Sequence, residues 1–281
     1  MNMHSSLIST QIAQDHLDNP VWRFFDCRYE LTAPEKKKEE YSLSHIPGAV
    51  YVDMNKDLAA THVAGKTGRH PLPSVDNLAL KFSAMGIDNS IQVAVYDDAG
   101  GSHAARFWWI LRWLGHDAVT VIDGGWSSWI KEERPVSSEI LIPVAKKFIA
   151  LPRINWTVTA DEIIKDFNKP ETCVLDARSG QRFRGENEKL DPVAGHIPGA
   201  LSAPFTDNLN ENGNWKSKSE LRQKFEKLLK GSPAEEAVSY CGSGITACHN
   251  ILAIYHAGLG DSRLYPGSWS EWITNSDRPV E

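Results

Sequence analysis

The sequence predicts an α/β protein of two tandem domains, each a mainly parallel sheet with helices on both faces. Three observations point to this fold class. The chain of 281 residues is long enough for two domains of ordinary size. Five short segments of the first half recur in the same order in the second half. Within each half, short apolar runs alternate with amphipathic helical patterns, which is typical of sheets of parallel strands.

The repeated segments keep both their order and their spacing. The offsets between partners run from 143 to 151 residues. The pairs are FFDCR (24–28) with VLDAR (174–178), HIPGAV (45–50) with HIPGAL (196–201), AVYD (94–97) with VSYC (238–241), GGWSSW (124–129) with GSWSEW (267–272), and RPV (134–136) with RPV (278–280). This agreement indicates a tandem duplication. We expect a first domain over residues 1–140, a linker over 141–155 and a second domain over 156–281.

Short runs rich in β-branched residues predict buried strands. The predicted strands are VAVYD (93–97), AVTVID (118–123), TCVLDAR (172–178) and AVSYC (237–241). Two segments predict helices that begin with a capping box, SKSELRQKFEKLLKG (217–231) and TVTADEIIKDFN (157–168). The first should end at Gly231. The charge run PEKKKEE (34–40) is expected to be a solvated loop.

Composition and charge disfavour several classes of protein. The chain is 41% hydrophobic and 23% charged, and its net charge of −6 comes without a large basic block, which disfavours nucleic-acid binding. The sequence starts without a basic segment followed by an apolar core, and no apolar run reaches transmembrane length. Four scattered cysteines favour neither a disulfide framework nor a zinc site. We therefore expect a cytoplasmic protein with no metal, no other cofactor and no membrane partner.

One cysteine follows a predicted strand at the place where a ligand would bind. Ligands of parallel sheets lie beyond the carboxyl ends of the strands, and Cys241 comes directly after AVSY (237–240). The loop GSGIT (242–246) supplies two glycines for tight curvature and two hydroxyl groups, and residues 247–258 predict a helix. Backbone N–H groups of this loop and helix start can converge on an anion. Cys241 is therefore predicted to be a nucleophilic thiolate.

The other cysteines and a rival chemistry are disfavoured. Cys27, Cys173 and Cys248 each lie in an apolar stretch, so we expect them to be structural. A cysteine phosphatase would need a phosphate-binding arginine at the sixth position after the nucleophile. That position is Ala247, which disfavours phosphatase activity.

These residues together resemble the two-domain rhodanese superfamily. The likeness comes from tandem HIPGA segments, a cysteine-led loop in the second domain alone, and GxWSxW near the end of each unit. The loop CGSGITAC (241–248) is similar to that of 3-mercaptopyruvate sulfurtransferases. Thiosulfate sulfurtransferases typically carry basic residues directly after the cysteine, where this chain has Gly242 and Ser243.

The resemblance implies a ping-pong sulfur transfer. Cys241 would take sulfur from mercaptopyruvate, release pyruvate, and pass the sulfur from a persulfide to a thiol or to cyanide. A thioredoxin-like protein is one candidate for the thiol acceptor. The first domain has Asp97 at the position of Cys241, and an aspartate cannot carry the sulfur. We therefore expect the first domain to be non-catalytic.

The resemblance also assigns residues that bind the substrate. Arg182, in DARSGQRFRGE (176–186), matches the position of a carboxylate-binding arginine. The loop residues expected to contact the substrate are Gly242, Ser243, Gly244, Ile245 and Thr246. Arg178 and Arg184 are expected to be solvated loop arginines. Relatives often carry a second arginine shortly after this stretch, and here Lys189 is the nearest cation.

A polar relay is the last implied element of the site. Family members use a first-domain aspartate and histidine together with the serine of the loop. The matching residues are Asp53, His70 and Ser243, which we expect to act in catalysis with Cys241.

Two alternatives stay open. The first is a thiosulfate sulfurtransferase of the same fold, which kinetics with the two donors would distinguish. The second is a non-enzymatic persulfide carrier, which would take up one sulfur without turnover.

Overall fold

The computed structural model describes residues 3–166 and 173–281, and the chain divides into two compact units. The first unit comprises Met1–Ala60, Pro73–Arg153 and Gly213–Trp215. The second comprises Thr61–Leu72, Ile154–Asn212 and Lys216–Glu281. The second unit therefore includes twelve residues, 61–72, from the first half of the sequence.

The first unit contains a sheet of five parallel strands in the order β1-β5-β4-β2-β3. The strands are β1 (Leu7–Ile8), β2 (Trp22–Asp26), β3 (Ala49–Tyr51), β4 (Gln92–Tyr96) and β5 (Val119–Ile122). The strands predicted at 93–97 and 118–123 are β4 and β5. Every residue of both strands is buried, and most of them are apolar, as expected for strands covered on both faces of the sheet.

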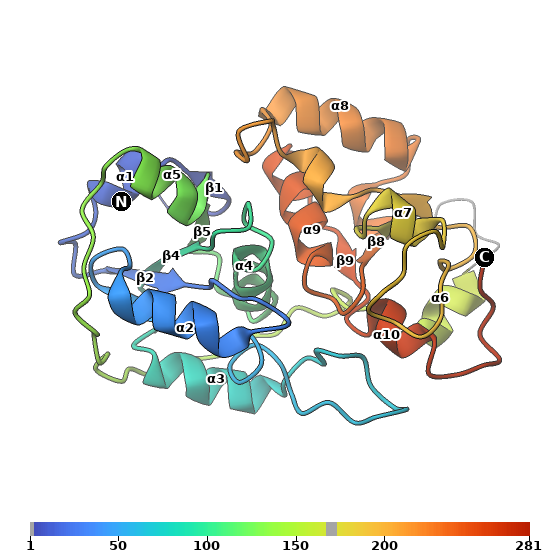
Figure 1. Ribbon diagram of the computed structural model, residues 1–281, viewed down its shortest axis with the longest axis horizontal. Helices are drawn as coiled ribbons and strands as arrows, with labels where there is room; N and C mark the ends of the chain where they lie inside the picture. The colour runs from blue at the N-terminus through green and yellow to red at the C-terminus, as the bar shows by residue number, and fades with distance from the viewer. Residues whose placement is uncertain (1–2, 167–172) are drawn as a thin grey trace. The chain divides into compact units, whose positions relative to one another are not determined.

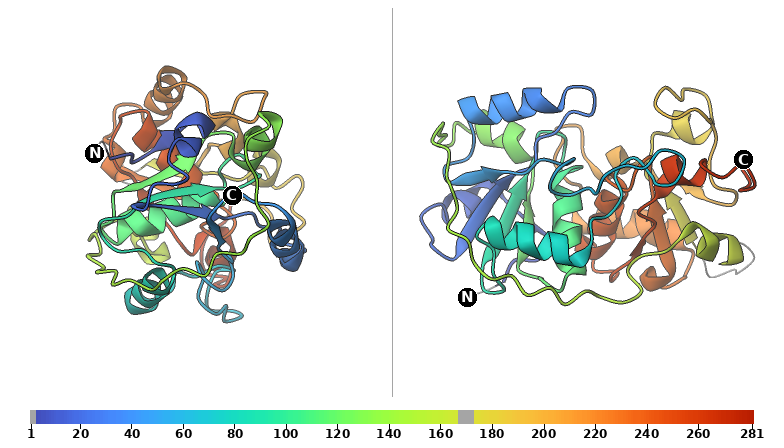
Figure 2. Two further views of the ribbon diagram at one scale, coloured as in Figure 1. Left: turned by 90° about the vertical axis from the view of Figure 1, so that its left-hand side faces the viewer. Right: turned by 90° about the horizontal axis from the view of Figure 1, so that it is seen from below.

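Helices cover both faces of this sheet (Figures 1 and 2). They are α1 (Thr10–Gln14), α2 (Pro34–Leu43), α3 (Val75–Ala84), α4 (Ala104–Trp113) and α5 (Gly125–Lys131). Phe24 lies in the cluster that α1 and α5 complete, together with Trp129. The next residue, Phe25, points to the opposite face, where its ring meets Phe107 of α4 with centroids 5.2 Å apart.

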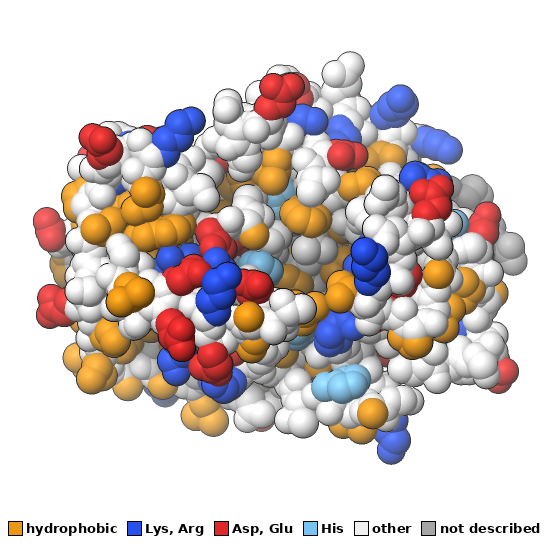
Figure 3. Space-filling view, in the orientation of Figure 1, with side chains coloured by type: hydrophobic (Ala, Val, Ile, Leu, Met, Phe, Trp, Pro, Cys, Tyr) orange, Lys and Arg blue, Asp and Glu red, His pale blue; other side chains and the backbone are white. Residues whose placement is uncertain are grey.

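The charge run at 34–40 forms a helix, so the prediction of a loop was wrong. Pro34 stands in the first turn of α2, where a missing N–H costs nothing. Lys37 pairs with Glu40 one turn later at 2.9 Å. Figure 3 shows acidic and basic side chains interspersed over this helix.

The second unit contains a sheet of four parallel strands in the order β7-β6-β8-β9. The strands are β6 (Cys173–Asp176), β7 (Leu201–Ser202), β8 (Ala237–Tyr240) and β9 (Arg263–Leu264). The helices are α6 (Ala160–Asp166), α7 (Gly180–Phe183), α8 (Lys218–Leu229), α9 (Ala247–His256) and α10 (Ser268–Trp272), with single 3₁₀ turns at Phe205–Asn208 and Ala234–Glu236. Parallel sheets flanked by helices in both units confirm the predicted fold class.

Both predicted capping boxes are present. Ser217 and Glu220 cap α8 reciprocally, and Thr159 and Glu162 do the same for α6. Helix α8 ends at Leu229, two residues before Gly231, because Lys230 already adopts the left-handed conformation with φ 51°. The predicted helix end at 167–168 and the strand start at Thr172 lie outside the described residues.

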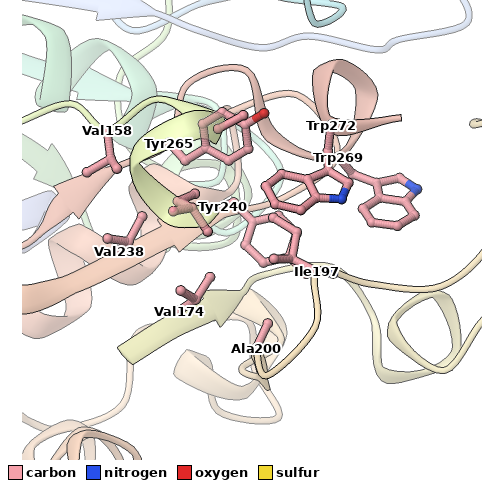
Figure 4. Close-up of a cluster of buried hydrophobic side chains, with 11 residues drawn as sticks. Val158, Val174, Ile197, Ala200, Val238, Tyr240, Tyr265, Trp269 and Trp272 are labelled. Carbon is pink, nitrogen blue, oxygen red and sulfur yellow. Dashed lines mark hydrogen bonds between the residues drawn. The ribbon is translucent and has the colours of Figure 1, made fainter. Parts of the chain in front are cut away.

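An aromatic cluster buries one face of the second sheet (Figure 4). Tyr240, the last residue of β8, packs in this cluster with Trp269 and Trp272 of α10. All three side chains are fully buried. The cluster therefore fixes the end of β8, from which the following loop starts.

Each unit buries an ion pair beside its aromatic cluster. In the second unit, Arg178 Nη2 lies 2.7 Å from Asp176 Oδ2, and the guanidinium stacks over Trp269 at 4.7 Å. In the first unit, Arg28 and Asp26 form the same pair at 2.7 Å. Arg178 is only 3% exposed, so its prediction as a solvated arginine was wrong: the buried carboxylate two residues earlier holds it inside.

Among the described residues, no helix combines the length and apolar character needed to cross a membrane.

Replacement of either buried aspartate should destabilise its own unit. Asp26→Asn removes the carboxylate that lies 2.7 Å from the buried Arg28, and Asp176→Asn leaves Arg178 with the more distant Glu188 at 3.5 Å. Breaking a buried pair in this way costs about 3–5 kcal/mol of unfolding free energy, and the loss should be smaller for Asp176→Asn because Glu188 remains. Urea unfolding followed by tryptophan fluorescence measures the loss. Glu186→Gln is the matched control, because Glu186 pairs with Arg184 where both side chains are exposed. Equal stability of all three variants and the unmodified protein would contradict the role of the buried pairs.

Candidate active site

Cys241 lies at the carboxyl end of β8, in the interior of the second sheet. Strand β8 pairs with β6 on one side and β9 on the other. The loop 242–246 follows, and α9 begins at Ala247. Cys241 is 2% exposed. The sequence therefore places the thiol correctly, between a buried strand and the start of a helix.

Gly244 donates its backbone N–H to the sulfur of Cys241 at 3.1 Å. Gly244 makes this contact from a left-handed backbone conformation, with φ +78°. A Cβ at this position would lie 2.5 Å from the carbonyl oxygen of Pro266. Only glycine meets both conditions. A hydrogen-bond donor here stabilises negative charge on the sulfur.

The segment that begins α10 holds the other side of the loop. Ser268 Oγ accepts the N–H of Cys241 at 3.1 Å and donates to Tyr265 O at 2.9 Å. The N–H groups of Trp269 and Ser270 donate to the carbonyls of Cys241 and Gly242, both at 2.9 Å. The sequence showed GSWSEW as a repeat but gave no sign that it would contact the cysteine loop.

Ser268 adopts a left-handed conformation that serine rarely takes. Its φ is +53°, which costs roughly 1–2 kcal/mol for a residue with a Cβ. The repeat-related residue in the first unit is Gly125, with φ +50°. The second unit therefore keeps a strained serine where a glycine would fit, and the serine hydroxyl caps the amide of Cys241.

Two guanidinium groups lie over Gly242. A Cβ built on Gly242 would be 3.4 Å from Arg69 Nη2 and 3.5 Å from Arg182 Nη1. Because residue 242 has no side chain, the space beside its Cα is bordered by guanidinium groups from two other segments. Arg182 was predicted from the sequence, whereas Arg69 was missed.

Arg69 could not be found from local pattern because it comes from a distant loop. It belongs to the part of the first half, 61–72, that is grouped with the second unit. Its N–H donates to Ser270 Oγ at 2.9 Å. Its Nε is buried and has no hydrogen-bond partner among the described residues. Lys189, the cation suggested by the sequence, is exposed.

The neighbouring His70 meets the predicted serine. A hydrogen bond of 2.8 Å joins His70 Nδ1 and Ser243 Oγ. His70 is 3% exposed and Ser243 is 7% exposed. Two of the three predicted relay residues therefore meet within the second unit. Asp53 belongs to the first unit, where its carboxylate accepts the N–H groups of Asn55 and Lys56.

The remaining predicted loop residues differ in exposure. Ile245 is 6% exposed, and Thr246, the residue before α9, is half-buried and makes no side-chain capping bond.

The other thiols have surroundings that suit inert residues. Burial raises the pKa of Cys173 to about 11. Burial, followed by the charge of Asp26, raises the pKa of Cys27 well above its ordinary value. Cys248 donates its thiol to Gly244 O at 3.4 Å. All four cysteines of the chain are free.

The repeat-related loop of the first unit encloses a carboxylate. Asp97, at the position of Cys241, accepts four backbone N–H groups at 2.8 Å. They belong to Ala99, Gly101, His103 and Ala104. This loop architecture is therefore an anion cradle, which the first unit fills with its own side chain.

Histidine, cysteine and acidic side chains form no cluster of three or more suited to a metal ion within residues 3–166 and 173–281.

Comparison with known proteins agrees with the repeat and the loop. The rhodanese-like domain matches the chain twice, over residues 9–132 and 159–275. The chain belongs to the rhodanese family. A protein described as "Probable 3-mercaptopyruvate sulfurtransferase" from Pseudomonas aeruginosa is 44% identical over 277 residues, 98% of each chain.

Two further relatives are named after different sulfur donors. The thiosulfate sulfurtransferase of Mus musculus is 32% identical over 280 residues, which cover 96% of this chain and 93% of that protein. The solved structure of 3-mercaptopyruvate sulfurtransferase from Leishmania major superposes with a TM-score of 0.87 at 30% identity, covering 98% of this chain and 76% of that one. The rhodanese family thus offers both sulfur donors as candidates for this chain.

Gly244→Ala should disrupt the cysteine loop of this rhodanese. The left-handed conformation alone costs an alanine about 1–2 kcal/mol, and the Cβ would collide with Pro266 O. We expect at least a 10-fold loss of sulfur transfer together with a lower thermal unfolding temperature. Gly213→Ala is the control, because φ is also positive there (+80°) but nothing lies within 4 Å of its Cβ. Full activity in Gly244→Ala would show that the turn is not required.

Proposed function

We propose that this protein is a 3-mercaptopyruvate sulfurtransferase that carries sulfur on Cys241. The observation that carries the proposal is the pair of guanidinium groups, Arg69 and Arg182, beside Gly242. They lie next to a sulfur that already accepts the N–H of Gly244 at 3.1 Å. A carboxylate held by these cations would leave its thiol-bearing carbon close to Cys241.

The first half-reaction moves one sulfur atom and one proton. The Cys241 thiolate attacks the sulfur of mercaptopyruvate, an S–S bond forms, and the donor's C–S bond breaks. The electron pair of that bond goes to the carbon, giving the enolate of pyruvate. The proton of the donor thiol ends on this carbon, so the products are pyruvate and a Cys241 persulfide.

The hydrogen-bonded pair of His70 and Ser243 is suited to moving this proton. Ser243 follows the nucleophile by two residues, and its hydroxyl is 2.8 Å from His70 Nδ1. We propose that the pair takes the proton from the donor thiol and returns it to the enolate carbon. Asp53 is proposed as a further member of this relay, on the family resemblance.

The loop residues 242–246 are proposed to hold the transferred sulfur. In the first unit, the related loop binds both oxygens of the Asp97 carboxylate through four N–H groups. The charge of a persulfide lies on its outer sulfur, two bonds from the Cβ of the cysteine. An aspartate oxygen is also two bonds from its Cβ. The loop therefore suits a persulfide.

The second half-reaction needs an acceptor. A thiolate or cyanide attacks the outer sulfur of the persulfide and restores the Cys241 thiolate. We propose a thiol acceptor, with a thioredoxin-like protein as one candidate. A cytoplasmic location is proposed because all four cysteines are free, as is usual in a reducing compartment.

A thiosulfate sulfurtransferase is the second candidate. Its specific support is the presence of two cations near the loop instead of one, which also suits a dianion. Against it, the loop itself contributes no cation, since Gly242 and Ser243 follow the nucleophile. Mercaptopyruvate carries its single charge on a carboxylate away from the transferred sulfur, which fits cations that stand outside the loop.

Steady-state kinetics with both donors test the proposal. The unmodified protein should turn over repeatedly and prefer mercaptopyruvate. Arg182→Ala should lower kcat/KM for mercaptopyruvate by roughly 10- to 150-fold, the loss of one charged hydrogen-bond group of about 1.5–3 kcal/mol. Arg184→Ala should have no effect, because Arg184 is exposed and pairs with Glu186.

Three outcomes would overturn parts of this proposal. A preference for thiosulfate in the unmodified protein would favour the second candidate. Uptake of a single sulfur without turnover would favour a persulfide carrier. Equal kinetics in Arg182→Ala and Arg184→Ala would remove Arg182 from the substrate site.

A further inference from the structure

The two cations of the site share one buried carboxylate. Asp191 Oδ1 lies 3.0 Å from Arg69 Nη1, and Asp191 Oδ2 lies 2.9 Å from Arg182 Nη2. A longer contact of 3.5 Å joins Arg69 Nη2 to Asp191 Oδ2. The Asp191 side chain is 2% exposed. Asp191 therefore ties together guanidinium groups that come from segments 113 residues apart in the chain.

A second acid completes the arrangement. Glu188 Oε2 accepts Arg182 Nε at 2.8 Å, and its side chain is 3% exposed. Burial is the largest single influence and raises the pKa of Glu188, but the hydrogen bond and charge of Arg182 together with the N–H groups of Leu190 and Asp191 outweigh it, so the pKa is lowered. Glu188 Oε1 accepts the N–H groups of Leu190 and Asp191, so it also fixes the backbone that carries Asp191.

The four charged groups cancel. Arg69 and Arg182 contribute two positive charges, and Asp191 and Glu188 contribute two negative charges. Arg178 also lies 3.5 Å from Glu188, and its positive charge is balanced by Asp176 at 2.7 Å. The cations beside Gly242 thus present fixed N–H donors in surroundings with little net charge.

We infer that Asp191 determines which sulfur donor the enzyme prefers, because it orients both guanidinium groups and cancels part of their charge. The inference rests on the proposed function. A monoanion gains mainly from donors in the right geometry, which Asp191 provides. A dianion gains mainly from net positive charge, which Asp191 removes. Because Coulomb energy is proportional to the charge of the ligand, Asp191 disfavours thiosulfate about twice as strongly as mercaptopyruvate.

Asp191→Asn should change the kinetics with the two donors to different extents. The variant keeps the shape of the side chain but loses the charge and one of the two acceptor oxygens. The ratio of kcat/KM for mercaptopyruvate to kcat/KM for thiosulfate should fall roughly tenfold, equivalent to about 1.4 kcal/mol. The change should appear in KM more than in kcat, and raised salt should weaken it.

A purely structural role for Asp191 predicts a different result. Damage to the fold would lower kcat/KM for both donors by the same factor. The ratio of the two values would then be unchanged, and this result would overturn the inference. Glu186→Gln is the matched control, since it removes an exposed acid five residues away and should leave the ratio as it is. Circular dichroism and thermal unfolding check that the variants fold.

Glu188→Gln gives an independent measurement if Asp191→Asn does not fold. It removes the other negative charge and should shift the ratio in the same direction. An unchanged ratio in Glu188→Gln would then overturn charge balance as the source of selectivity. Failure of the proposed function looks different, because the unmodified protein itself would then prefer thiosulfate or fail to turn over.

Discussion

The N–H of Gly244 reaches the sulfur of Cys241 only because the chain turns left-handed there, and the rest of the site is arranged around that turn. Strand β8 leads into it from a fixed position, since Tyr240 is buried against Trp269 and Trp272. The α10 segment holds it from the other side through Ser268 and two backbone N–H groups. The strain at Ser268 is offset by this capping of Cys241. The thiol is thus positioned by packing and backbone bonds, before any substrate binds.

The duplication shows how one loop architecture serves two purposes. In the first unit the loop closes on the carboxylate of Asp97, which satisfies four N–H groups. In the second unit a cysteine occupies that position, and a glycine follows it where the first unit has Asp98. Asp98 pairs with Lys37 at 2.7 Å. One unit thus fills its anion cradle with its own carboxylate, whereas the other places a nucleophile beside it.

The fold could be predicted from sequence because its signals are local and repeated. Buried strands such as β8 are short apolar runs, and helices α6 and α8 carry capping boxes at fixed spacing. The cysteine loop was equally visible, since two glycines and two hydroxyl residues directly follow a strand. Each of these features is determined by residues close together in the chain, so it can be predicted from the sequence.

Features that depend on tertiary contact were missed or misread. Arg69 lies more than a hundred residues before the segment that it joins, and nothing near it marks a cation site. Arg178 looked like a loop residue, but Asp176 holds it in the core. Lys189, which the sequence suggested as a second cation, is exposed, and the second guanidinium beside Gly242 belongs to Arg69. The partner of Arg69 is Asp191, far away in the chain, whereas the partner of Arg178 is only two residues away but is buried by the tertiary fold.

The most direct measurement concerns the sulfur on Cys241. Unmodified protein and Cys241→Ser are incubated with mercaptopyruvate in the absence of an acceptor, and mass spectrometry of the intact protein and its peptides follows. The account predicts a gain of one sulfur atom on the Cys241 peptide, an equal amount of released pyruvate, and loss of that sulfur when cyanide is added. Cys241→Ser should gain none. Sulfur on Cys27, Cys173 or Cys248, or pyruvate release by the serine variant, would contradict the account.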